Sequence, residues 1–171
     1  MLRNLMVLGA ALATIAAAAP WRSYSHPEAG FTIEAPEGFV LNSDKQVDGA
    51  RTRLYGVRSG DLVFGIVSTD ASTAVPASEW AQGEIAVANA VADGAAMETK
   101  EISRTQIAYP GGGAVEVLLR DAEIVSRTRI LVRRPWVLHL AVIALPEQEA
   151  LVNSPEADRF LNSAKVVVPA I

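Results

Sequence analysis

Residues 136–145 read WVLHLAVIAL, and this run constrains the fold more than any other part of the chain. A strand with one solvent-exposed face alternates apolar and polar residues, because successive side chains point to opposite faces of the sheet. Here the residues at both odd and even positions are apolar, apart from His139. The run therefore predicts a central strand that is covered on both faces.

Shorter strand-like runs precede this segment, and turn-forming residues separate them. They cover residues 31–35, 39–41, 50–58, 62–69, 97–108, 114–120 and 124–133. Residues 59–61 (SGD) and 109–113 (YPGGG) have the composition of tight turns. Strands joined by such short links pair antiparallel, so the sequence predicts a mostly antiparallel sheet.

Two segments carry helical signals. From Pro76 to Gly94 polar residues recur at helical spacing, and the opposite face carries Trp80 together with smaller apolar residues. Near the C-terminus, Ser154 is a favoured N-cap residue and Pro155 suits the first position of a helix. A sheet that carries helices belongs to the α+β class, and we predict a single domain over residues 30–168.

The first 18 residues predict export from the cytoplasm. Arg3 gives a short positive region, an apolar stretch follows from Leu5 to Ile15, and the alanines at 16–18 fit a signal peptidase site. The apolar stretch is shorter than the roughly 20 residues of a membrane-spanning helix, which disfavours the alternative of a retained anchor. We therefore expect cleavage near Ala18, a periplasmic or secreted location without stable membrane insertion, and a polar leader over residues 19–29.

Composition excludes several classes of function. The chain has no Cys, so it offers no thiol nucleophile and no Cys-ligated metal site. With 15 Lys and Arg against 19 Asp and Glu, the formal net charge of -4 argues against a nucleic-acid partner. The sequence has no calcium loop of alternating acids and no G-x-S-x-G motif, and we predict no catalytic residue, cofactor or metal.

Two stretches near the ends of the domain resemble the PsbP-like family. Residues 30–39 (GFTIEAPEGF) resemble the family's opening pattern G-F-S-I-x-x-P-x-G-W/F, and residues 158–163 (DRFLNS) resemble its closing pattern F-L-x-S-F. Between them, residues 129–142 are similar to the family's penultimate hairpin. Ala164 departs from the pattern, since an aromatic residue is usual there. The resemblance spans residues 30–168.

The resemblance implies an α/β/α sandwich with a central antiparallel sheet. Relatives include a photosystem accessory subunit, a Ran-binding nuclear import factor and exported bacterial proteins without assigned activity. The superfamily shares no catalytic constellation, so the resemblance transfers no catalytic residue to this chain.

Two pairs of arginines are the first candidates for a binding site. Arg51 and Arg53 share one face of a predicted strand, and Arg127 and Arg129 share one face of another. If the two strands lie near each other, the guanidinium groups would form a patch that binds the carboxylate or phosphate groups of an anionic partner. The alternative is a solvated sheet face on which the arginines pair with acids of neighbouring strands. Such acids are Glu98, Glu101, Glu116 and Asp121.

His139 lies inside the predicted central strand and is a further candidate. It could act as a base or a ligand, or it could be a core residue that forms a hydrogen bond with a neighbour. No second histidine is placed to share a metal with it, which favours the core residue.

Export, the motifs and the resemblance lead to one preferred function and two alternatives. We predict a non-catalytic accessory protein of the cell envelope that contacts another envelope protein. The first alternative is a small-ligand binder with a pocket between the helix at residues 77–94 and the sheet. The second alternative is a hydrolase with its active site around His139.

Overall fold

A large antiparallel sheet forms the centre of the molecule. The computed structural model describes residues 19–168 apart from residues 48, 74 and 98, so the predicted signal peptide lies outside the described residues. The strands of the large sheet are β3 (Val40–Val47), β4 (Ala50–Ser59), β5 (Leu62–Asp70), β6 (Lys100–Gln106), β7 (Gly113–Arg120), β8 (Val125–Arg133) and β9 (Trp136–Ala144). They lie in the order β3-β4-β5-β9-β8-β7-β6, and all neighbouring pairs are antiparallel. The predicted central strand is confirmed, because β9 is the middle strand of this sheet.

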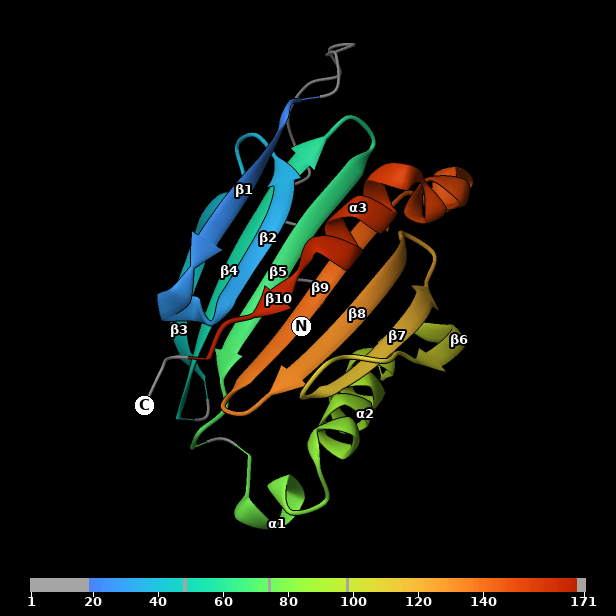
Figure 1. The fold of residues 1–171 in the computed structure, drawn as a ribbon. Coiled ribbons are helices and arrows are strands. Elements are labelled where there is room, and N and C mark those ends of the chain that lie inside the picture. The colour runs from blue at the N-terminus through green and yellow to red at the C-terminus, as the bar shows by residue number, and fades with distance from the viewer. Residues whose placement is uncertain (1–18, 48, 74, 98, 169–171) are drawn as a thin grey trace.

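Each face of the large sheet carries a covering layer. A small antiparallel sheet covers one face with the order β1-β2-β10, formed by β1 (Trp21–His26), β2 (Phe31–Pro36) and β10 (Lys165–Val166). The helix α3 (Pro155–Ser163) lies beside it and packs against β2 and β9. The helix α2 (Glu84–Ala96) lies behind the large sheet in Figure 1 and packs on β7 and β8, and the short helix α1 (Ala77–Trp80) lies below the sheet in this view and contacts α2. The predicted α+β sandwich with a central antiparallel sheet is therefore confirmed.

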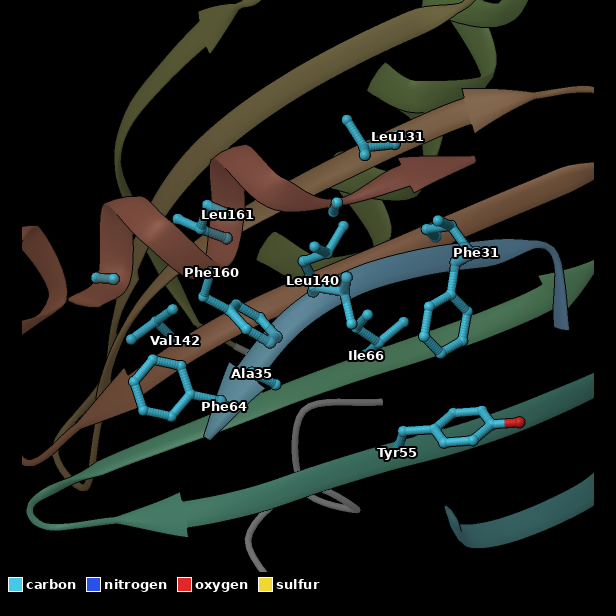
Figure 2. Close-up of a cluster of buried hydrophobic side chains, with 14 of the residues drawn as sticks. Phe31, Ala35, Tyr55, Phe64, Ile66, Leu131, Leu140, Val142, Phe160 and Leu161 are labelled. Carbon is cyan, nitrogen blue, oxygen red and sulfur yellow. The ribbon is translucent and has the colours of Figure 1, made fainter. Parts of the chain in front are cut away.

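Aromatic side chains dominate the core between the large sheet and the layer of β2 and α3. Phe160 of α3 points toward Phe64 of β5, and the two ring centroids are 5.2 Å apart (Figure 2). Phe31 of β2 contacts Tyr55 of β4 edge to face, with centroids 5.1 Å apart. All four side chains are almost completely buried, so this cluster anchors the small sheet and α3 on the large sheet.

The side chains of β9 divide between the two covering layers. Leu138, Leu140 and Val142 belong to the aromatic core under β2 and α3. Val137, Ala141 and Ile143 belong to a second core under α2. His139 lies on this second face, because it has the same parity as those three residues. The apolar character at both parities thus reflects two separate cores.

The predicted polar leader at residues 19–29 contains a strand. Residues 21–26 form β1, which pairs with β2 from Trp21 opposite Pro36 to His26 opposite Phe31. Tyr24 places its ring 5.4 Å from that of Phe39. This strand could not be recognised from the sequence, because β1 lies at the edge of the small sheet and half of its side chains face solvent.

Two further elements differ from the prediction. The helix predicted over residues 77–94 is broken into α1 and α2, because Gly83 adopts a positive φ of 92° between them. The strand predicted over residues 39–41 begins at Val40 and continues to Val47, with a bulge between Leu41 and Ser43. Its polar sequence reflects its position as an edge strand that is exposed on both sides.

The start of α3 is as predicted. The Ser154 hydroxyl accepts a hydrogen bond from the backbone N–H of Ala157 at 3.2 Å, and Pro155 is the first helical residue. A short 3-10 segment over Pro146–Asn153, which the sequence did not indicate, links β9 to this helix.

Candidate functional site

The four predicted arginines lie in two places on the large sheet. Arg51 and Arg53 are on β4, Arg127 and Arg129 are on β8, and β5 and β9 lie between these strands. Strands in a sheet are about 4.8 Å apart, so the two pairs are about 14 Å apart. As predicted, the two arginines of each pair point to the same face of their strand, and this is the face that carries β2 and α3. The structure does not bring the four side chains into one patch.

Asp44 of β3 accepts hydrogen bonds from both arginines of β4. Arg51 donates two hydrogen bonds to its carboxylate, at 2.9 and 2.7 Å. Arg53 donates a third at 3.3 Å and another to the carbonyl oxygen of Glu28. The hydrogen bonds from Arg51 are the main cause that lowers the pKa of Asp44 to about 2. Arg53 is only 7% exposed, so its guanidinium connects β4 to the segment between β1 and β2.

Glu116 of β7 holds the pair on β8. Its carboxylate accepts from Arg127 at 2.8 Å and from Arg129 at 2.7 Å. Arg127 also donates to Asp158 of α3 at 2.6 Å, and Arg129 donates to the carbonyl oxygen of Leu161 at 2.8 Å. The contacts with Asp158 and Leu161 connect α3 to the sheet. The pairing with Glu116 is the cross-strand pairing with an acid that the sequence left open as the alternative to a binding patch. That any of the four arginines binds an anionic partner stays a prediction.

His139 is buried in the second core. Its side chain is 4% exposed, and its Nε2 has no hydrogen-bond partner among the described residues. The expected hydrogen bond to a neighbour is therefore not seen at this nitrogen. Burial lowers the pKa of His139 from 6.5 to about 4, so the imidazole is neutral at pH 7.

His139 lines a cavity of about 310 Å³ between α2 and the large sheet, which we call the α2 cavity. The other lining residues come from β5, β9, α2 and the segment after β5, and they are Val67, Thr69, Ala71, Val75, Val91, Gly94, Ala95 and Val137. The small residues Gly94 and Ala95 leave this space open, since α2 itself packs over β7 and β8. From the sequence a pocket was expected between this helix and the sheet, but neither of these two residues was a candidate.

The chemistry around His139 does not favour the predicted hydrolase. A general base should have a pKa near the working pH, and a pKa of about 4 makes a weak base at pH 7. Thr69 is the hydroxyl residue in the lining, and its Oγ1 lies 3.2 Å from the hydroxyl of Thr52 rather than at the imidazole. The cavity walls are otherwise aliphatic or glycine.

The described residues of the chain hold neither a helix that could cross a membrane nor a metal-binding cluster. No helix there has both the length and the apolar character of a membrane crossing. No group of three or more His, Asp or Glu side chains there could hold a metal ion.

Comparisons with known proteins identify the fold. No protein-family model and no curated protein sequence matches the chain. The solution structure of cyanobacterial PsbP (CyanoP) from Synechocystis sp. PCC 6803 is similar with a TM-score of 0.58 and 12% identity, over 92% of this chain and 98% of that chain. The Ran-binding protein Mog1p of Saccharomyces cerevisiae gives a TM-score of 0.46 at 10% identity, over 87% of this chain and 96% of that chain. The match to CyanoP over almost the whole of both chains shows that this chain has a PsbP-like fold.

Proposed function

We propose that the protein is exported to the cell envelope, where it acts by binding a small ligand in the α2 cavity. The sequence of residues 1–18 supports the proposed export. The observation that supports the proposed binding is the α2 cavity itself, whose volume of about 310 Å³ is in the range of small-molecule sites.

The walls of the α2 cavity indicate the class of ligand. Val67, Val91 and Val137 give it apolar surfaces on the sheet side and the helix side. His139 is the titratable residue of the lining, and its Nε2 has no partner among the described residues. The Nε2 is itself buried, so a ligand in the cavity contacts mainly the aliphatic walls. The ligand that fits is a small, apolar and uncharged molecule.

Native mass spectrometry tests this proposal on protein purified at low salt from its own cells. We expect a stoichiometric small-molecule adduct on the wild type, and its loss in Ala95→Leu, because the larger side chain fills the cavity. Ala90→Leu is the matched control, since Ala90 lies on the exposed side of the same helix. The absence of any adduct, or an adduct that survives in Ala95→Leu, would contradict the proposal.

A protein partner is the second candidate, and the outer edge of β3 favours it. Val40, Leu41 and Val47 are 54%, 48% and 40% exposed on this strand. An edge strand offers unpaired backbone N–H and C=O groups to which an extended segment of another chain can add. We therefore propose another envelope protein as a partner that adds a strand to β3.

Crosslinking in cells tests this second candidate. Leu41→Lys places a charge on the proposed contact, and we expect a protein adduct to fall at least fivefold. Ile102→Lys is the control, because Ile102 is 47% exposed on β6 at the opposite edge of the sheet. Equal loss in both variants, or no loss in Leu41→Lys, would rule out β3 as the contact.

A further inference from the structure

A second cavity, of about 440 Å³, lies on the opposite face of the large sheet from the α2 cavity. It is open to solvent and is bordered by the loop before β7, the start of β7, β8, and the segment from the end of α3 to β10. The lining residues are Ile107, Ala108, Tyr109, Pro110, Ala114, Arg129, Leu131, Arg133, Leu161, Asn162, Ala164, Lys165 and Val166. We call it the basic cavity, because its charged lining residues are all cationic.

Two of its cations lack an acidic partner. Arg129 is neutralised by Glu116, which it contacts at 2.7 Å. Arg133 and Lys165, in contrast, form no ion pair with any residue that the structure describes. Both residues line the cavity and are exposed to solvent.

The walls of the basic cavity are held by contacts within the protein. The Tyr109 hydroxyl accepts a hydrogen bond from the backbone N–H of Val166 at 2.8 Å, which ties the loop before β7 to β10. Gly111 has a φ of 70°, and a Cβ at this position would lie 3.7 Å from the Cζ of Arg133. The guanidinium of Arg133 thus lies against the glycine turn of the loop. A site that is formed before the ligand arrives loses less entropy on binding.

The remaining wall is apolar. Leu131 of β8 and Leu161 of α3, both labelled in Figure 2, line the cavity together with Ile107 and Val166. Apolar surface favours a ligand with an apolar group, and the unpaired cations favour a negatively charged head group. Arg133 has the planar donors that match a carboxylate or a phosphate.

We propose that the basic cavity binds a small anion that carries an apolar group, with its carboxylate or phosphate beside Arg133 and Lys165 and its apolar part against Ile107 and Tyr109. This site is separate from the α2 cavity and does not depend on the proposed function. The two cavities differ in ligand charge, because the α2 cavity has a neutral histidine and the basic cavity has two unpaired cations.

Calorimetric titration of the purified protein tests the proposal, with octanoate and octyl phosphate as probes. We expect at least one of these anions to bind at least tenfold more tightly than octanol, which lacks the charge, and than acetate, which lacks the chain. The double variant Arg133→Gln/Lys165→Gln should weaken that binding at least tenfold. The control Lys45→Gln/Lys100→Gln removes two exposed lysines of the edge strands β3 and β6 and should leave the binding unchanged.

The variant Ala95→Leu separates this inference from the proposed function. Binding that Ala95→Leu abolishes and Arg133→Gln/Lys165→Gln leaves intact would place the anion in the α2 cavity and overturn the inference. Octanol that binds as tightly as both anions, or anions that do not bind at all, would also overturn it. Urea unfolding of each variant verifies that a loss of binding is not a loss of fold.

Discussion

Glu116→Gln is expected to destabilise the protein by about 3 kcal/mol, because the largely buried Arg129 would lose its carboxylate partner while Arg127 would keep Asp158. Glu116 is the shared acceptor for Arg127 and Arg129, whose side chains are only 17% and 10% exposed. Glutamine keeps the size of the side chain and removes its charge, so both guanidinium groups would lose their cross-strand counter-charge. The measurement is the free energy of unfolding in urea at pH 7.

An exposed ion pair gives the matched control for this substitution. Glu149 pairs with Arg120 at 2.5 Å, but these side chains are 39% and 45% exposed. Exposed pairs contribute about 0–1 kcal/mol, so Glu149→Gln should change the stability much less than Glu116→Gln. Equal effects of the two substitutions would show that Glu116 acts as an ordinary surface residue.

The arginines show which part of the site could be predicted from the sequence. The face of the strand to which each arginine points depends only on the alternation of side chains along that strand. It was therefore predicted correctly from the local sequence. The distance between the pairs depends on strand order, which is a property of the whole chain. β9 is far from β5 in sequence and pairs with it in space, and this places two strands between Arg53 and Arg129.

The fold was predictable where a segment is buried and was missed where it is exposed. β9 is buried along its whole length, so its sequence alone indicated its position at the centre of the sheet. β1 and β3 lie at sheet edges, and the exposed polar residues in them give no clear strand pattern. The break between α1 and α2 rests on Gly83, and a glycine within a helical pattern does not by itself fix where a helix ends.

The α2 cavity was expected only as an alternative, because a cavity depends on what neighbouring elements fail to fill. The sequence places Gly94 and Ala95 near the end of a helix, but it does not show which strands lie opposite them. In the structure those residues face His139 and Val137 of β9 across open space. The lack of a hydrogen-bond partner for the Nε2 of His139 could likewise not be predicted from the sequence, because a hydrogen bond depends on contacts between distant strands.

Lowering the pH from 7 to 4 is expected to destabilise the wild type by up to about 3 kcal/mol relative to His139→Leu. The pKa of His139 is lowered by burial from 6.5 to about 4 in the folded protein. The unfolded chain therefore binds more protons between these pH values, so the stability falls as the pH decreases through this range. The difference in pKa corresponds to about 3 kcal/mol, and leucine at this position has no proton to bind.

Urea unfolding at pH 7, 6, 5 and 4 measures this effect, with His26→Gln as the control for the other histidine. His26 is partly exposed and contacts Glu28, so His26→Gln should retain the wild-type dependence on His139. At pH 7, His139→Leu should match or exceed the stability of the wild type, because it removes a buried nitrogen without a partner. A parallel loss of stability in wild type and His139→Leu would assign the pH dependence to other groups. Retained stability together with a lost adduct in His139→Leu would instead show that this histidine serves the ligand rather than the fold.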